Sequence, residues 1–330
     1  MKTNKHAPRG AGPAILLLAA LLLTTAAVFR LRVRAPEPAQ ESPVNVEVRT
    51  VKPAAVTAAV QPQSAPRARL AYCYNILLSG LDDAGGGSDT NLLMRFDAGN
   101  GRIDLVSLPR DTLLHHEWYS NKLNYAYALG GTEQLAEEIE NLLGVPVDYC
   151  VTVDLSGFTA LVDRIGGVDF EIPADMDYDD PAQDLHIHYT KGLHHLTGKQ
   201  AMEVVRWRKN NDGGGYADAD IGRIRTQQAF LEAVAQKALS LKNIPALARV
   251  FSDSVKTDLT LGNLVWLAGE AADVGLEGVS FHTLPGDGAG YYRRESVYVL
   301  DPEATLALVN EALNPYDGPI RADELDVFVP

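Results

Sequence analysis

The chain has 330 residues, a formal net charge of −14 and 46% hydrophobic residues. This composition is typical of a globular protein, and the length allows one large domain or two domains of ordinary size. An acidic chain lacks the net basic face that nucleic-acid binding needs, so the balance argues against a nucleic-acid partner. It still allows a local group of arginines around a small anionic ligand.

The N-terminus has the pattern of a membrane anchor. Residues 1–12 carry Lys2, Lys5 and Arg9 and are predicted to be cytoplasmic. The apolar segment 13–30 is near the short end for a spanning helix and long for a cleaved signal, and arginines follow it. We predict an uncleaved, single-pass signal anchor with the rest of the chain outside the cytoplasm, although the sequence leaves cleavage open.

The segment 35–69 is rich in proline and alanine and poor in aromatic residues. Such a composition predicts an extended, largely disordered linker that holds a folded domain away from the membrane. The folded domain is predicted over residues 70–315, and residues 316–330 are expected to form a C-terminal tail.

The first half of the domain alternates buried strands with helices. Apolar runs predict the strands 74–80, 90–96, 102–108, 148–155 and 168–172. Thr132 and Gly144 bound a predicted helix as N-cap and C′ residue, and Ser156 is expected to cap a short helix.

The second half begins with a polar segment at 175–190. Thr197 and Gln200 then form a capping box, and a long helix is predicted over 221–241. Asp301–Pro302 has the Asp-cap, Pro-N1 pattern of a last helix. The order of elements predicts an α/β domain in which helices flank a mixed central sheet.

The chain has two cysteines, Cys73 and Cys150, each in or beside a strand-like run. Their separation does not fit a zinc site. We expect two buried thiols. A disulfide is the alternative if the domain lies in an oxidising compartment.

A glycine-rich loop lies between the first two strands, with Gly85–Gly87 flanked by Asp82 and Asp89. Glycines let backbone N–H groups approach an anion, and the nearby carboxylates fit that role if a cation such as Mg²⁺ lies between them and phosphate oxygens. A flexible acidic turn explains the loop equally well.

Two further clusters combine arginine with polar residues. Arg110 and Asp111 follow the third strand, at the edge of the sheet where α/β proteins bind ligands. Arg206 and Arg208 end one predicted helix, and Arg223 and Gln227 lie four residues apart on the next. Converging arginines suit a diphosphate because a guanidinium binds two oxygens at once. The alternatives are a surface turn and a solvated basic face.

Four histidines, at 186, 188, 194 and 195, fall within a short span. "HIH" on a strand places both rings on one face, which invites a zinc site. No acidic residue accompanies them at a familiar ligand spacing, so we interpret them as solvated surface residues.

The ordered motifs "NILLSGLD", "SDT", "SLPRDT", "KLNYAYALGG", "GGVDFEIP", "GLHHLTGKQAMEVVRWRK" and "DADIGRIRTQQAFL" resemble the LytR–CpsA–Psr family. The resemblance covers residues 72–241 well and extends more weakly to 313. It implies an anchored, extracytoplasmic phosphotransferase. Members of the family move a phosphorylated glycopolymer, such as teichoic acid or capsule, from an undecaprenyl-diphosphate carrier to peptidoglycan.

The resemblance also implies roles for individual residues. By position, Asp82 and Asp89 match magnesium-linked aspartates, and Arg110 matches a diphosphate-binding arginine. Apart from the resemblance, we expect a nearby carboxylate, Asp89 or Asp111, to accept the proton of the attacking hydroxyl, and the sequence does not choose between them. The remaining head-group contacts are expected from Arg206, Arg208, Arg223 and Gln227. Thr226 departs from the family, since many members have arginine there.

The lipid carrier implies an apolar tunnel between the sheet and the helices that start near residues 156 and 220. Its candidate lining residues, each of which can equally be ordinary core, are Leu161, Val162, Ile165, Phe230 and Val234. Two other functions use the same phosphate site. One is a non-catalytic scaffold that binds lipid-linked glycan, and the other is a pyrophosphatase that acts on polyprenyl diphosphates.

Overall fold

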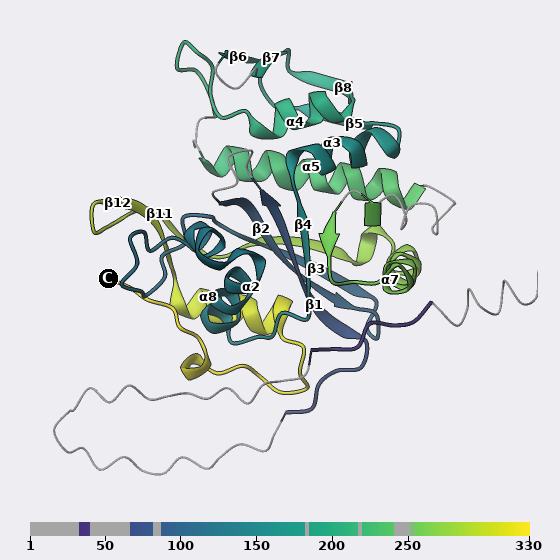
Figure 1. Ribbon diagram of the computed structural model, residues 1–330, viewed down its shortest axis with the longest axis vertical. Helices are drawn as coiled ribbons and strands as arrows, with labels where there is room; N and C mark the ends of the chain where they lie inside the picture. Colours follow the sequence, from purple (N-terminus) through teal and green to yellow (C-terminus); the bar gives the residue numbers. More distant parts are fainter. Residues whose placement is uncertain are drawn as a thin grey trace, which may run out of the picture.

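The computed structural model describes residues 33–39, 67–81, 87–181, 185–216, 220–240, 252–253 and 255–330, with only part of the side chains in 220–240. A central sheet has helices on both faces, and a smaller lobe covers one end of the sheet (Figure 1). We call this part, which comprises residues 155–240, the upper lobe. The mixed α/β architecture confirms the predicted fold class.

The central sheet has six strands in the order β10-β3-β2-β1-β4-β9. Neighbours β1–β2, β2–β3 and β4–β9 are antiparallel, whereas β1–β4 and β3–β10 are parallel. The strands are β1 (Cys73–Leu81), β2 (Ser88–Asp97), β3 (Arg102–Leu108), β4 (Tyr149–Val153), β9 (Lys256–Thr257) and β10 (Val279–Thr283).

Helices cover the two faces because side chains alternate along each strand. On one face, Leu77, Leu93 and Val106 join a core with α2 and the C-terminal helices. On the other, Ile76 and Phe96 pack against α7. The elements are α2 (Leu123–Leu143), α7 (Leu261–Val274), α8 (Pro302–Leu308), the π-helix η2 (Val309–Leu313), the 3₁₀ turns η1 (Leu276–Gly278) and η3 (Ala322–Glu324), and the hairpin β11 (Gly286–Tyr292) with β12 (Glu295–Leu300).

The upper lobe has its own apolar core, centred on Phe170, Trp207 and Phe230. Three helices and two antiparallel pairs of short strands build it above the end of the sheet where β1 and β4 terminate (Figure 1). They are α3 (Leu155–Arg164), α4 (Gly198–Arg206), α5 (Asp220–Ser240), the pair β5 (Val168–Ile172) and β8 (Gly192–Leu196), and the pair β6 (Met176–Asp180) and β7 (Leu185–Tyr189).

Several predicted boundaries agree with the structure. Strands 102–108 and 168–172 match β3 and β5, and the capping box of Thr197 and Gln200 begins α4. The helix predicted from Thr132 is the second half of α2, which continues across a kink at Gly130–Gly131, where Gly131 has a φ of 68°. Gly144 ends α2 in the left-handed conformation, as predicted.

The cap of α3 was predicted wrongly. Asp154, not Ser156, is the N-cap, and its Oδ1 accepts from the backbone N–H of Gly157 and from the hydroxyl of Ser156. Both residue types can cap a helix, so their order alone does not fix the start. The polar segment 175–190 also holds two strands, β6 and β7, because alternate side chains there are buried in the upper lobe.

Residues at both ends of the domain pack onto its lower part, opposite the upper lobe. In the segment 33–39, the N–H of Ala39 donates to Asp148 at 2.9 Å and the carbonyl of Pro36 accepts from Tyr74 at 2.8 Å. Past residue 315, Ile320 is buried in the core and Glu324 pairs with Arg67. The predicted anchor 13–30 and residues 40–66 of the predicted linker lie outside the described residues. None of the helices in the described ranges has the length and hydropathy needed to cross a bilayer.

Cys73 is buried, Cys150 is half-buried and both are free thiols. In the register of β1 with β4, Cys150 lies opposite Leu77, four positions from Cys73. That offset corresponds to about 13 Å along the strand, whereas a disulfide requires Cα atoms within about 7 Å. The alternative of a Cys73–Cys150 disulfide is therefore wrong.

Candidate functional site

The register between β2 and β3 places Asp89 beside Arg110. Asn91 pairs with Leu108, so the same antiparallel register carried two residues further sets Asp89 opposite Arg110. A guanidinium nitrogen of Arg110 lies 2.5 Å from Oδ1 of Asp89. The structure thus brings two of the predicted site residues into direct contact at the upper end of the sheet.

A tight turn after β3 holds Arg110 in place. The backbone N–H and the hydroxyl of Thr112 both donate to the carbonyl of Pro109, at 3.0 and 2.6 Å. The carbonyl of Arg110 accepts from the N–H of Asn124, in the first turn of α2, at 2.9 Å. The backbone of Arg110 is therefore fixed on both sides of the residue, which sets the direction in which its side chain leaves the sheet.

Asp111 lies between two cations. Lys122 Nζ is 3.1 Å from one oxygen of Asp111, and Nε of Arg110 is 3.9 Å from the other. Lys122 is not among the predicted site residues, although it opens the motif "KLNYAYALGG". Its position as the N-cap residue of α2 turns it toward the end of β3. The motif was the available signal, but only the packing of α2 shows the contact.

A second group lies in the upper lobe, where α4 ends and α5 passes beside it. Trp207 is buried, and its neighbours Arg206 and Arg208 are half-buried and exposed. The side-chain amide of Gln227 donates to the carbonyl of Val205 at 3.2 Å. Gln227 thus ties α5 to the end of α4, which makes it a positioning residue for Arg206 in this structure.

The side chains of two predicted site residues lie outside the described part of the structure. Asp82 lies outside the described residues, directly after Leu81, the last residue of β1. Arg223 is on α5, but its side chain is outside the described part. Thr226, the departure from the family, is buried, and its hydroxyl contacts the Tyr216 hydroxyl at 2.7 Å and the Gly222 carbonyl at 3.0 Å. An arginine at 226 would have to displace these contacts.

A cavity of about 310 Å³ opens next to the ends of β1 and β4. One face of α3 and its N-cap residue form part of its wall, and the other lining residues are Leu81, Thr152, Asp253, Val255 and Lys256. The Ser156 hydroxyl, followed by the Gly157 N–H, lowers the pKa of Asp154 on this wall. Val162, Ile165 and Phe230 are buried in the upper-lobe core, with Val234 packed against it and Leu161 half-buried. The lipid tunnel stays a prediction.

The described site therefore combines two cations with two carboxylates at one corner of the sheet. The side chains of Arg110, Asp89, Asp111 and Lys122 retain 26%, 43%, 34% and 22% of their exposure. Partly exposed ion pairs are weak and exchange partners readily, so a stronger anion can displace a carboxylate from Arg110. Such a site can bind a phosphate group, and its carboxylates can hold a cation or accept a proton.

Comparison with protein families places the chain in a known group. The model of the LytR_cpsA_psr family matches residues 45–313. The polyisoprenyl-teichoic acid–peptidoglycan teichoic acid transferase TagU of Bacillus anthracis is 34% identical over 222 residues, which cover 65% of this chain and 69% of that protein.

Solved structures agree with these matches. The crystal structure of Bacillus subtilis TagV has a TM-score of 0.60 and 27% identity, and the alignment covers 71% of this chain and 92% of TagV. The structure of TagT bound to LIIa-WTA has a TM-score of 0.57 and 25% identity, with 72% of this chain and 89% of TagT covered.

Proposed function

Since the chain belongs to the LytR–CpsA–Psr family, we propose that it is a phosphotransferase that attaches a phosphorylated glycopolymer to peptidoglycan. The donor is the polymer on an undecaprenyl-diphosphate carrier, and the product is a phosphodiester between polymer and wall. The name of the related TagU describes the same transfer for teichoic acid. The observation that carries the proposal is the contact of Arg110 with Asp89, beside the Asp111–Lys122 pair.

Arg110 is the central diphosphate ligand in this proposal. Its guanidinium has a planar fork that suits two phosphate oxygens, and the turn after β3 fixes its backbone. Asp89 contacts one nitrogen of that fork. The further arginines, Arg206, Arg208 and Arg223, are proposed to bind the remaining oxygens from the upper lobe, with Gln227 fixing the end of α4.

The residues also fit a magnesium ion. Mg²⁺ prefers oxygen ligands, keeps several waters and often binds through one or two carboxylates plus substrate phosphates. Asp89 offers a half-exposed carboxylate at the sheet edge, and Asp82 is proposed as its partner from the end of β1. When bound, the ion would neutralise the charge that develops on the phosphate oxygens.

The chemical step is a displacement at phosphorus. A sugar hydroxyl of peptidoglycan attacks the glycan-proximal phosphorus, a new P–O bond forms and the bond to the bridging oxygen breaks. The carrier leaves as undecaprenyl phosphate. We assign the hydroxyl proton to Asp111, because Asp89 is the proposed ligand of the cation. Lys122 keeps Asp111 at the site and the arginines stabilise the transition-state charge.

The predicted anchor 13–30 and the linker fit a substrate whose lipid remains in the membrane. We propose a single-pass protein whose catalytic domain faces the cell wall. Tethering raises the local concentration of the domain at the bilayer surface, where the carrier is found.

Transfer from purified lipid-linked glycan to peptidoglycan, assayed as a new phosphodiester, tests this function. The full chain with Mg²⁺ should form the product, and Arg110→Ala should form it roughly 10- to 150-fold more slowly. Product release without an acceptor would indicate a pyrophosphatase instead. Saturable binding with neither product would indicate a scaffold. Both of these outcomes contradict the transferase.

A further inference from the structure

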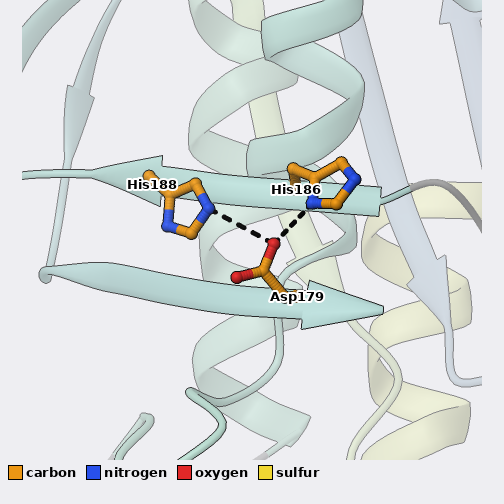
Figure 2. A group of neighbouring side chains, drawn as sticks. All are labelled: Asp179, His186 and His188. Carbon is orange, nitrogen blue, oxygen red and sulfur yellow. Dashed lines mark hydrogen bonds and ion pairs between the residues drawn. The ribbon is translucent and has the colours of Figure 1, made fainter. Parts of the chain in front are cut away.

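The antiparallel strands β6 and β7 carry a cluster of exposed imidazole and carboxylate side chains, the types that bind transition metals. His186 and His188 alternate with the buried Leu185 and Ile187, so both rings lie on the exposed face. In the antiparallel register, Asp179 lies opposite His186 and Asp177 lies opposite His188. Figure 2 shows the two rings on either side of the Asp179 carboxylate.

The donor atoms of three residues converge. His186 Nδ1 is 2.5 Å and His188 Nε2 is 3.3 Å from the same oxygen of Asp179. One ligand atom from each residue lies within 4.8 Å of the others. Donors that share a tetrahedral zinc ion are separated by about 3.3 Å, given Zn–N and Zn–O bonds near 2.0–2.1 Å. Small rotations of exposed side chains are enough to admit an ion.

Asp177 contacts the His188 ring at the nitrogen that does not face Asp179, and so orients that ring. Its carboxylate lies 2.7 Å from Nδ1 of His188. With the Nδ1 proton donated to Asp177, Nε2 presents its lone pair toward Asp179. This carboxylate–histidine arrangement orients the imidazole of many metal sites and increases its basicity. The acidic partners of these histidines lie on the neighbouring strand β6. Spacing along the chain therefore does not reveal them, which is why the sequence predicts plain surface histidines.

We propose that Asp179, His186 and His188 bind a divalent zinc-type cation, with Asp177 orienting His188. Two imidazoles and a carboxylate suit Zn²⁺ and related late transition metals, whereas Mg²⁺ prefers oxygen ligands. The charges of Asp177 and Asp179 balance a divalent ion. The side chains of Asp179, His186 and His188 are 48%, 51% and 53% exposed, so an ion would reach them directly and water would complete its coordination.

The site is joined to the loop that follows Arg208. The amide N–H groups of Asp177 and Asp179 donate to the side chains of Asn210 and Asn211, at 2.7 and 2.6 Å. Asn211 donates back from its side chain to the Asp179 carbonyl and from its backbone to the Asp177 carbonyl, at 3.1 and 3.2 Å. An ion that fixes β6 against β7 therefore also fixes this loop. Metal binding at this site does not depend on the proposed transferase function. An effect of the metal on transfer, through Arg208, would rest on that function.

Isothermal titration of the full, metal-free chain with Zn²⁺ tests the site. The chain should carry a tag without histidine. We expect one saturable ion per chain. The double variant His186→Ala/His188→Ala should weaken binding at least about tenfold, since changing even the outer partners of metal ligands costs roughly 10- to 100-fold in affinity. Asp179→Asn should also weaken it. The matched control is His194→Ala/His195→Ala, which removes two histidines of the adjacent β8 and should leave the affinity unchanged.

Hydrogen exchange provides a second measurement that does not depend on activity. Zn²⁺ should slow exchange of the Asn211 amide in the parent chain and in the His194/His195 control, but not in the His186/His188 variant. The absence of saturable binding, or equal loss in the control variant, would overturn the site. A chain that binds Zn²⁺ as expected but does not catalyse transfer would contradict the proposed function and leave the metal site intact.

Discussion

The lower and upper ends of the central sheet use the same types of charged residue in opposite ways. At the lower end, the side chains of Asp148 and Asp104 are fully buried. Asp148 accepts from Arg69 and from the N–H groups of Asn75 and Ala39. At the upper end, Asp89 and Asp111 are each partly exposed and contact flexible cations.

The difference shows where charge serves folding and where it serves a ligand. A buried carboxylate is tolerated only when its partners are all in place, so it fixes the structure around it. Asp104 follows this rule, with Arg95, Arg102 and His282 around it. A partly exposed pair contributes little stability, and its members can change partners when a phosphate arrives.

The largest expected effect on stability is at the lower end of the central sheet. Asp148→Ala removes the acceptor for Arg69 and for two backbone N–H groups, and should lower the free energy of unfolding by about 3–5 kcal/mol. Urea denaturation measures it. Asp111→Ala is the control for removing a carboxylate from the upper end and should change stability far less. Equal losses in the two variants would refute the comparison.

Arg110→Ala should have the opposite effect: it should slow transfer but leave the free energy of unfolding nearly unchanged. Losing a charge-assisted contact costs about 1.5–3 kcal/mol, which corresponds to roughly a 10- to 150-fold slower transfer. The free energy of unfolding should stay nearly unchanged, because the pair with Asp89 is partly exposed. Arg110→Lys keeps the charge without the fork and should recover only part of the rate. Transfer within about threefold of the parent chain in Arg110→Ala would exclude the proposed role.

Lys122→Ala should have a smaller effect. The Lys122–Asp111 pair is partly exposed, so its loss should change stability by about 0.2–1 kcal/mol. If Asp111 accepts the proton, the variant should also transfer more slowly, because Lys122 no longer holds Asp111 at the site. Transfer at the rate of the parent chain would instead favour Asp89 as the acceptor.

The thiols of Cys73 and Cys150 should not react with an alkylating reagent until the chain unfolds. Burial raises the pKa of Cys73 and of Cys150 from an ordinary value of 9.0 to about 12. Both should resist alkylation at pH 8 and react in urea. Unfolded thiols lose their protons near pH 9 whereas the folded ones keep them, so stability should fall as pH rises above 9. Rapid labelling of the folded chain would show that these strands open readily.

Much of the fold follows from local pattern. The apolar runs of β3 and β5, the capping box of α4 and the left-handed Gly144 each depend on neighbours in sequence, and each was predicted at the right residues. The cap of α3 was missed because Asp154 and Ser156 compete within one turn. The strands β6 and β7 were missed because their exposed faces are so polar.

The sequence by itself determined the family, the class of fold and the position of Arg110 at the end of a strand, since these depend on residue order. Tertiary structure alone decided that Lys122 meets Asp111, that Asp179 meets His186 and His188, and that residues 33–39 dock on Asp148. The physical reason is strand register and packing. Periodicity along the chain shows which face a side chain occupies, but its partners come from other segments, and only the folded chain brings them within bonding distance.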